Sequence, residues 1–167
     1  KKAGWTRDIG VGDTSAYSKL CMLNAFNLTI PGVPTIYYGD EFGMPGGNDP
    51  DNRRMMKFDN LSPIENRTLD VVKKLVNLRR NTMALNYGNF ETLLADSTQY
   101  AYARTYLQSS AIVVFNKSDE DKSIIFKLPD YVVGRNFTSK FGSNFSIQNQ
   151  IVKVDLKPNS FGILISK

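Results

Sequence analysis

The period of the hydrophobic pattern changes near Gly88, and this change constrains the fold more than any other feature of the sequence. Before Gly88 the apolar residues recur every three or four positions, as they do along one face of an α-helix. From Asn89 onward they recur at every second position, which is the period of a β-strand. We therefore expect two parts of different class, residues 1–88 with helices and residues 89–167 made of strands.

The second part contains seven short segments rich in β-forming residues, separated by clusters of Gly, Asn, Asp and Ser. These segments are residues 90–95, 100–107, 111–116, 123–128, 137–141, 151–156 and 161–165. Many short strands with polar turns between them are typical of two packed antiparallel sheets. Residues 89–167 are therefore predicted to form an all-β antiparallel sandwich domain.

The first part carries the signals of two helices. A helix is expected over residues 16–30, because the two prolines within residues 31–34 cannot continue a helical hydrogen-bond ladder. A second helix begins at Ser62, whose hydroxyl and the Glu65 carboxylate form the pattern of a capping box. Its apolar positions continue toward Gly88, which supplies a stop signal.

A short apolar run over residues 35–38 lies between the two helices and predicts a buried β-strand. A helix that leads into such a strand is one step of a parallel α/β sheet. One strand cannot form a sheet alone, so residues 1–88 are predicted to be an α/β fragment, the end of a domain whose beginning lies outside this sequence. Residues 1–5 also lack an initiator Met and a signal peptide, which favours a piece of a longer protein.

The composition excludes several functional classes. A hydrophobic fraction of 41% excludes a disordered chain, and a single Cys excludes a disulfide scaffold. The absence of His removes Ser-His and Cys-His catalysis and most zinc sites, so we expect no metal and no cofactor in this chain. The net charge of +5 is spread along the sequence without a basic stripe, so no nucleic-acid partner is expected. No apolar run reaches the roughly 18 residues of a membrane span.

The long loop over residues 40–61 is where we expect a functional site, because ligands of α/β proteins bind beyond the C-terminal ends of the strands. Residues 31–44, which end in Tyr38-Gly39-Asp40-Glu41-Phe42-Gly43-Met44, resemble the last barrel strand of the α-amylase family of glycoside hydrolases. Residues 46–54 resemble the next loop of that family, most closely in its neopullulanase and cyclodextrinase branch. The resemblance implies the end of a TIM-type (β/α)8 barrel in residues 1–88, followed by the C-terminal sandwich in residues 89–167.

The same resemblance implies that the parent protein is a retaining α-glucan hydrolase acting on starch-derived oligosaccharides. It implies α-1,4 cleavage and leaves α-1,6 cleavage open. The motifs of the three catalytic carboxylates precede the strand seen here, so the resemblance implies no catalytic residue in this chain and no activity of this chain alone. Calcium, where a parent protein uses it, is expected outside this sequence. The substrate class slightly favours a secreted or periplasmic location without fixing one.

Two acidic residues at the end of the predicted strand, Asp40 and Glu41, could be mistaken for a catalytic pair. A retaining glycosidase needs two carboxyl groups about 5 to 5.5 Å apart across the sugar. Adjacent residues at a strand end tend to point to opposite faces, so a structural role at the barrel mouth, binding backbone amides, is favoured.

Asp49 and Arg53 are the candidate substrate-binding residues. Their spacing matches the loop that contacts donor-side glucose units in the family that the sequence resembles. A carboxylate accepts from sugar hydroxyls and a guanidinium donates several fixed hydrogen bonds, although the two residues could also pair only with each other and fix the loop. Asp51 and Arg54 are expected to be solvated or to fix the loop.

Five tyrosines offer aromatic surfaces that could bind sugars. Tyr37 and Tyr38 could stack on sugar rings, but packing in a core is favoured. The alternating residues Tyr100, Tyr102 and Tyr106 could form a carbohydrate platform, but the half-buried face of a sandwich is favoured.

The expected partners are an α-glucan oligosaccharide and the rest of the catalytic barrel. Two alternatives stay open: a non-catalytic carbohydrate-binding or structural sandwich module, and a transglycosylase of the same family. Since a barrel strand needs partners on both edges, we also expect residues 1–60 to be less protected from hydrogen exchange than the sandwich, or to be covered by another copy.

Overall fold

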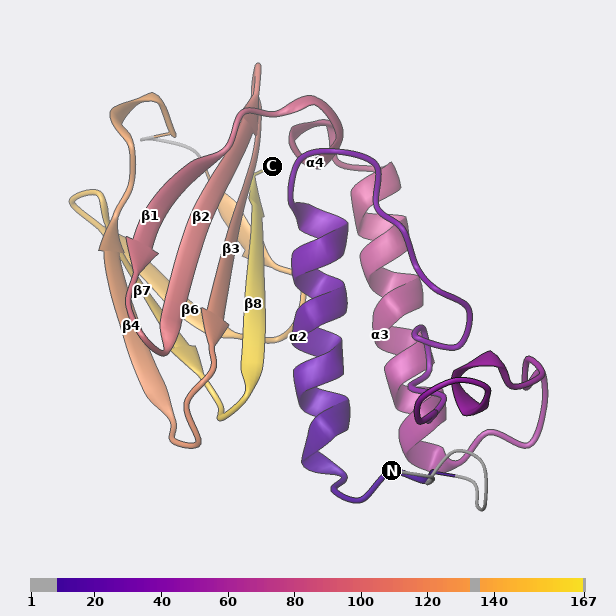
Figure 1. Cartoon of the computed structure of the whole chain (residues 1–167). Coiled ribbons are helices and arrows are strands. Elements are labelled where there is room, and N and C mark those ends of the chain that lie inside the picture. The colour runs from indigo at the N-terminus through magenta and orange to yellow at the C-terminus, as the bar shows by residue number, and fades with distance from the viewer. Residues whose placement is uncertain (1–8, 133–135, 167) are drawn as a thin grey trace.

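The computed structural model describes residues 9–132 and 136–166, in which helices come first and strands follow (Figure 1). The helices are α2 (Ser15–Thr29), η1 (Asp51–Arg53), α3 (Pro63–Arg80), α4 (Met83–Tyr87) and η2 (Asp130–Val132). The strands are β1 (Glu91–Ala95), β2 (Gln99–Tyr106), β3 (Ser109–Asn116), β4 (Lys122–Lys127), β5 (Phe137–Ser139), β6 (Asn144–Gln148), β7 (Ile151–Leu156) and β8 (Ser160–Ser166).

The strands form two sheets in which every pairing is antiparallel. The larger sheet has the order β1-β2-β3-β8-β5, and the smaller one has the order β4-β7-β6. Alternate residues of each sheet point inward and form a common apolar core that includes Ile112, Ile124, Val152 and Leu164. The predicted antiparallel sandwich is therefore confirmed.

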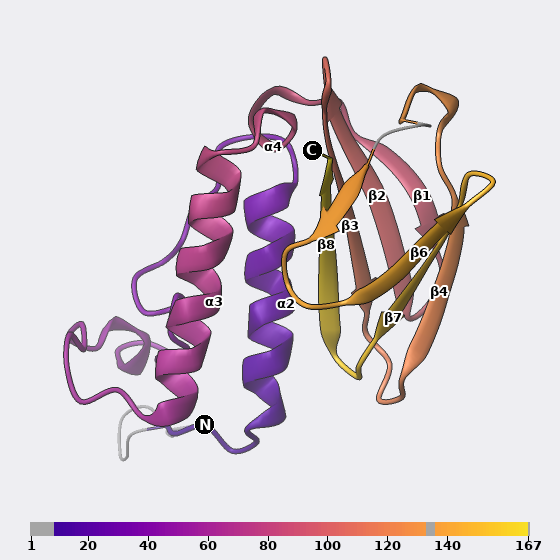
Figure 2. The same ribbon diagram turned by 180° about the vertical axis from the view of Figure 1, so that it is seen from behind.

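The helices α2 and α3 cover the outer face of the five-stranded sheet, so the molecule has three layers (Figure 2). The central strand β3 is buried on both faces, because one face contacts the small sheet and the other contacts the helices. A second apolar core lies between helices and sheet, with Ala25, Leu28, Val72, Leu75, Tyr102, Val113, Phe115 and Ile163. Because strands on this sheet are apolar on both sides, they require the helices as a cover.

Two buried arginines bind the C-terminal end of α2. Arg104, on β2, is 1% exposed and donates to the carbonyl oxygens of Thr29 (2.6 Å) and Gly88 (2.9 Å). Arg79, on α3, donates to the carbonyl oxygens of Leu28, Ile30 and Gly32. The last carbonyls of a helix lack partners inside the helix and carry partial negative charge, so they are suitable acceptors for the two guanidinium groups.

The first helix prediction holds closely, and the second holds at its start. The first helix was expected over residues 16–30 and is α2, Ser15–Thr29. The capping box of Ser62 and Glu65 is present at the start of α3, with each side chain bonded to the backbone of the other residue. The second helical segment breaks after Arg80 and resumes as α4, so it is not one helix as far as Gly88.

Two strand predictions are corrected. Residues 35–38 are not a strand here, because a strand needs a hydrogen-bonded neighbouring strand and none of the described strands pairs with this segment. The strand β6 was missed, since its apolar residues Phe145 and Ile147 are interspersed with Asn, Ser and Gln. In residues 9–132 and 136–166, no helix combines the length and the hydropathy needed to cross a bilayer.

Candidate functional site

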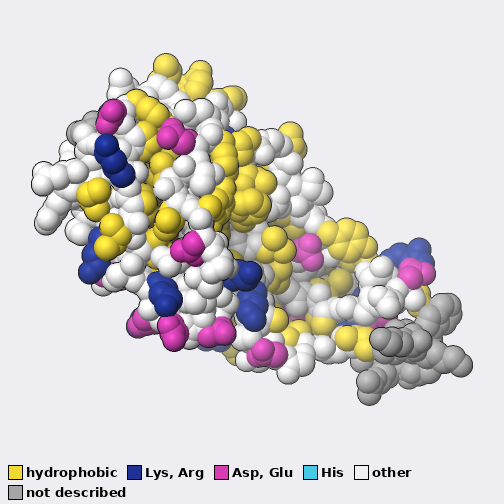
Figure 3. Space-filling view, turned by 60° about the vertical axis from the view of Figure 1, so that its left-hand side comes forward, with side chains coloured by type: hydrophobic (Ala, Val, Ile, Leu, Met, Phe, Trp, Pro, Cys, Tyr) yellow, Lys and Arg dark blue, Asp and Glu magenta, His cyan; other side chains and the backbone are white. Residues whose placement is uncertain are grey.

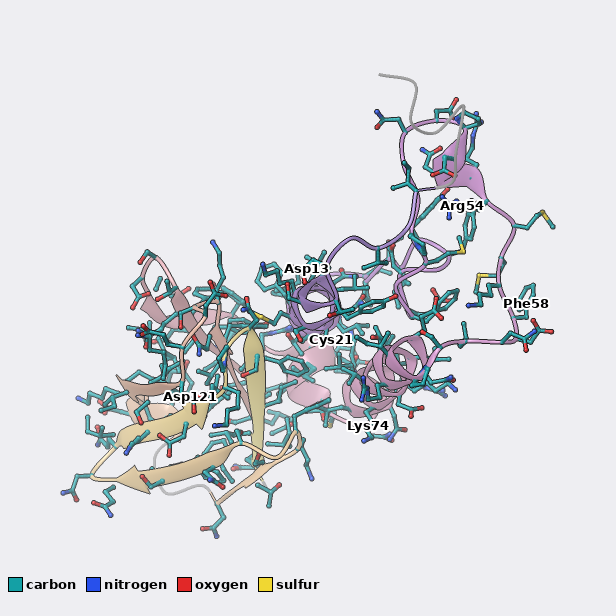
Figure 4. The ribbon with its side chains drawn as sticks, turned by 90° about the horizontal axis from the view of Figure 1, so that it is seen from below. Asp13, Cys21, Arg54, Phe58, Lys74 and Asp121 are labelled. Atoms are coloured by element: carbon teal, nitrogen blue, oxygen red, sulfur yellow. The ribbon has the colours of Figure 1, made fainter. Side chains whose placement is uncertain are left out.

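The loop between α2 and α3 lies at the N-terminal end of α3, on the side away from the sheet (Figures 1 and 4). Its first half contains the residues that resemble the barrel strand, and η1 follows at residues 51–53. The site is therefore built from side chains of one loop that stands apart from the sandwich. Figure 4 shows Arg54 and Phe58 on this loop, well separated from Asp121 on the sandwich.

Asp51 holds the loop together. Its carboxylate accepts hydrogen bonds from the backbone amides of Gly47 (2.6 Å) and Ile9 (3.4 Å). Arg54 donates to both carboxylate oxygens of Asp51, through Nε at 2.7 Å and through a terminal nitrogen at 2.6 Å. The Arg54 guanidinium, together with the two amides, lowers the pKa of Asp51 to about 2. The expectation that this residue pair fixes the loop is met by these contacts.

Asp49 and Arg53 form a second ion pair on the same loop, with 2.5 Å between the carboxylate and the guanidinium. The pair is exposed, since 60% of the Asp49 side chain and 64% of the Arg53 side chain remain accessible. Exposed ion pairs contribute only about 0 to 1 kcal/mol to stability. Asp49 and Arg53 therefore pair with each other, as the sequence allowed, while their remaining hydrogen-bonding groups stay accessible to a ligand.

Tyr37 and Tyr38 are exposed rather than packed in a core, so the interpretation favoured from the sequence is wrong for this chain. Their rings lie against each other with centroids 4.6 Å apart, and the Tyr38 hydroxyl donates to the Arg54 carbonyl at 3.0 Å. A hydrogen bond with Tyr37 raises the pKa of Tyr38, and the nearby Arg53 guanidinium opposes this shift. An exposed aromatic pair thus lies beside the Asp49–Arg53 ion pair.

Asp40 and Glu41 have different surroundings. The Glu41 carboxylate accepts from the Gly39 amide at 2.7 Å, which is a bond to backbone of the kind the sequence predicted. Burial and the Glu41 charge raise the pKa of Asp40, and the Asp40 carbonyl accepts from the Asn24 side chain at 3.3 Å. The position of both residues at a barrel mouth stays a prediction.

Two further side chains on the loop were missed by the sequence interpretation. Phe58 is 86% exposed and Met55 is 91% exposed. The sequence did contain a signal for Phe58, because an aromatic residue in a surface loop rich in Gly and Pro is expected to have little core to pack against. On the sandwich, Tyr102 is fully buried against α2, where its hydroxyl lies 2.5 Å from the Thr29 hydroxyl. The packing role favoured for that tyrosine stripe is confirmed at Tyr102.

The exposed side chains of the loop carry both polar groups and aromatic rings. The carboxylate of Asp49 accepts from hydroxyl groups, the guanidinium of Arg53 donates, and the rings of Tyr37 and Tyr38 offer apolar faces. Within the part of the chain that the structure describes, His, Cys, Asp and Glu side chains do not gather in groups of three that could hold a metal ion.

No protein-family model matches the chain. Among curated proteins, the chain is 34% identical over 166 residues to the amylopullulanase of Thermoanaerobacterium thermosulfurigenes, an alignment that covers 90% of this chain and 9% of the relative. It is 42% identical over 100 residues to the cyclomaltodextrinase of Thermoanaerobacter pseudethanolicus, covering 59% of this chain and 17% of the relative. Other relatives are named neopullulanase and cyclomaltodextrin glucanotransferase.

The fold has close counterparts among solved structures. An α-amylase from Anoxybacillus superposes with a TM-score of 0.78 at 24% identity, over 89% of this chain and 32% of that protein. At this identity the likeness shows the fold alone. In every one of these comparisons, the chain spans less than a third of the relative's length.

Fold and loop together define a class: an antiparallel sandwich with covering helices, preceded by a polar loop that carries an exposed acid–arginine pair. The sequence relatives make the assignment specific. The chain is a C-terminal region of the α-amylase family.

Proposed function

We propose that this chain is the C-terminal part of an enzyme that cleaves α-glucans, and that Asp49 and Arg53 bind a donor-side sugar of the substrate. The observation that carries the proposal is the exposed Asp49–Arg53 pair beside two exposed tyrosine rings. The names of the relatives, amylopullulanase and cyclomaltodextrinase, support a starch-derived oligosaccharide as the substrate.

The two ion pairs of the loop have separate roles in this proposal. Asp51 and Arg54 form bonds to each other and to the backbone, and thereby hold the shape of the loop. Asp49 and Arg53 add little stability in their exposed positions and are left to contact the ligand. A sugar that displaces water from this pair would gain charge-assisted hydrogen bonds, which are stronger than neutral ones.

The remaining parts of the chain have supporting roles. Residues 35–38 supply the last strand of the catalytic barrel once the rest of the barrel provides partners on both edges. Asp40 and Glu41 bind backbone amides at the barrel mouth. In this proposal the boundary between barrel and sandwich lies at residue 88, and the catalytic carboxylates lie in the part of the parent protein outside this chain.

A first consequence is that the 167-residue chain alone has no glycosidase activity. The resemblance places all three catalytic carboxylates outside this chain, and positioning groups cannot replace a nucleophile. The test is the release of reducing sugar from maltooligosaccharides by the purified chain. Release above that of a boiled sample contradicts the proposal.

The binding role is tested with Arg53→Ala in the parent enzyme. A hydrogen bond to a charged group contributes about 1.5 to 3 kcal/mol, so kcat/KM should fall roughly ten- to a hundredfold. The loss should be larger for long oligosaccharides, which fill the distant donor subsite, than for short ones.

Arg54→Ala is the matched comparison, since Arg54 is the adjacent residue of the same type. Its removal leaves the Asp51 carboxylate without its main partner, so we expect a lower melting temperature and a loss of kcat/KM that is similar for every substrate length. A length-independent loss for Arg53→Ala, with a lower melting temperature, would contradict the sugar contact and leave the family assignment intact.

A transglycosylase is the second candidate function, favoured by the relative named cyclomaltodextrin glucanotransferase, which is 36% identical over 124 residues. A hydrolase and a transglycosylase share the donor side of the cleft and differ in whether water or a sugar accepts the glycosyl group. Product analysis of the parent enzyme with maltotriose and added glucose distinguishes the two, because only transfer produces oligosaccharides longer than the substrate.

A further inference from the structure

A cleft of about 430 Å³ lies where the N-terminal halves of α2 and α3 meet the sandwich. The helices contribute residues from both sides, and the sandwich contributes the segment after β5 and the start of β8. Sites for small molecules are typically about 300 to 1,000 Å³ in volume and occur preferentially where domains meet. Asp49 and Arg53 do not line this helix–sheet cleft, so it is separate from the loop described above.

Two aromatic rings form the apolar part of the helix–sheet cleft. The rings of Phe141 and Phe161 lie with their centroids 4.9 Å apart, and both side chains are half-buried. Phe161 belongs to β8, and Phe141 lies in the segment after β5, which passes close to α2 in Figure 2. The face of an aromatic ring carries partial negative charge, whereas the C–H groups on the face of a pyranose ring carry partial positive charge. The two rings therefore offer suitable surfaces for a sugar.

The polar part of the cleft binds by hydrogen bonds and contains no acidic group among the described residues that line it. Arg67, on α3, is exposed and forms no ion pair with another described residue. The Ser160 hydroxyl donates to the Lys157 carbonyl at 2.7 Å and keeps its acceptor lone pairs. A guanidinium that donates and a hydroxyl that accepts are suitable partners for the hydroxyl groups of a neutral sugar.

The charges around the cleft do not favour a polyanion. Lys157, whose carbonyl binds Ser160, pairs with Asp121 at 2.5 Å. Figure 3 shows basic and acidic side chains interspersed along the edge of the sandwich, without an area of one sign on that face. A surface that attracts polyanions has a patch of positive charge, so the described groups fit a neutral ligand better.

We propose that the helix–sheet cleft is a second, non-catalytic binding site for a short segment of an α-glucan. In this site Phe141 and Phe161 contact the faces of sugar rings, and Arg67 and Ser160 bind sugar hydroxyl groups. The proposal rests on the proposed function, because the α-glucan is the ligand which that function brings to this chain. A second site on the same molecule keeps a long substrate attached and raises its effective concentration at the first site.

Cys21 is a native reporter for the cleft. It is the one Cys of the chain, it lines the cleft, and Figure 4 shows it on the side of α2 that faces α3. Burial raises the pKa of the Cys21 thiol, and a hydrogen bond with Thr68 opposes this shift, so labelling is followed at alkaline pH, where more thiolate is present.

Protection of Cys21 from iodoacetamide tests the proposal. Alkylation is measured by mass spectrometry of the Cys21 peptide, so the same measurement applies to the 167-residue chain and to the parent enzyme. With maltoheptaose at about ten times its Kd, labelling should slow about tenfold, because only the ligand-free protein reacts.

Arg67→Ala tests the contact with the sugar. It should weaken the Kd of maltoheptaose, taken from the protection curve, at least about tenfold, which is the loss expected for one hydrogen bond to a charged group. Phe141→Ala is a second variant and should also weaken the Kd. Arg80→Ala is the matched control, since Arg80 lies on the same helix but outside the cleft, and its Kd should not change.

Four results would overturn the proposal. Labelling of Cys21 that maltoheptaose does not slow would show that no glucan occupies the cleft. An unchanged Kd in both Arg67→Ala and Phe141→Ala would show that the cleft residues do not hold the sugar. Protection by inorganic phosphate and not by maltoheptaose would identify an anion site. Loss of protection in Arg53→Ala would place the bound glucan at the loop. The proposed function is judged separately, by the kcat/KM of Arg53→Ala on oligosaccharides of different length, so the two failures are distinguishable.

Discussion

At the scale of single residues, the loop shows how similar sequence features acquire different roles. The segment Asp49-Pro50-Asp51-Asn52-Arg53-Arg54 offers two acids and two arginines within six residues. The resemblance to the family singled out Asp49 and Arg53 as the sugar-binding pair, and this assignment stays a prediction. The sequence could not predict that the Asp51 carboxylate also binds the amide of Ile9, because that contact spans 42 residues and depends on how the loop folds back on the chain.

The lowered pKa of Asp51 gives a prediction on pH. Its folded value of about 2 lies below the ordinary value of 3.8, so its contribution to stability is fully present above about pH 4 and is lost as the pH falls through 2. Asp51→Asn should lower the melting temperature near neutral pH, and the difference from the unmodified chain should shrink as the pH approaches 2. Asp49→Asn is the control and should show little difference at any pH. A difference for Asp51→Asn that persists unchanged at pH 2 would contradict the assignment.

At the scale of secondary-structure elements, both ends of α2 and the start of α3 were predictable from local signals. The end of α3 at Arg80 was not, and neither was the clamp that Arg79 and Arg104 form on the C-terminal end of α2. Proline and the capping box act within a few residues of a helix end, so these helix ends can be predicted from the local sequence alone. Arg104 lies on β2, a strand in which tyrosines alternate with other residues. This alternation predicts which face of the sheet the Arg104 side chain occupies, but it does not predict which group the side chain binds. Its acceptor on Thr29 lies 75 residues away.

The clamp predicts a large cost for Arg104→Met. The substitution leaves the carbonyls of Thr29, Gly88 and Asn89 without their buried donor. An unsatisfied buried group costs about 1 to 3 kcal/mol, so the free energy of unfolding should fall by roughly 3 kcal/mol or more. In a chain of this size that corresponds to a decrease in melting temperature of about 6 to 12 °C. Arg80→Met, at the exposed last residue of α3, should change the melting temperature little. Equal effects of the two substitutions would argue against the clamp.

At the scale of the whole molecule, the change of period at Gly88 separates a helical part of the sequence from a β part, but the two parts share one apolar core. The apolar cluster between helices and sheet contains Ala25 and Leu28 of α2 together with Val113 and Ile163 of the sheet. Local periodicity assigns each element its class, but it carries no information on which elements share a core. The parts that did not follow from the sequence, the covered sheet face and the absent strand at residues 35–38, both depend on contacts between distant segments.

This shared core refines the expectation that residues 1–60 exchange their amide hydrogens faster than the sandwich. The C-terminal half of α2 is packed on the sheet and bound by Arg79 and Arg104, so its amides should open only when the sheet opens. Residues 33–61 lack strand pairing among the described residues and contribute few side chains to the core, so they should exchange fast. Hydrogen exchange followed by mass spectrometry on the dilute chain measures both segments at once, with α3 as an internal reference. We expect slow exchange in α2, α3 and β3 and fast exchange in residues 33–61. Fast exchange of α2 together with slow exchange of the sheet would instead mean that the helices open independently of the sandwich. Slow exchange of residues 33–61 would mean that the loop is held by contacts other than the arginine clamp and the Asp51–Arg54 pair.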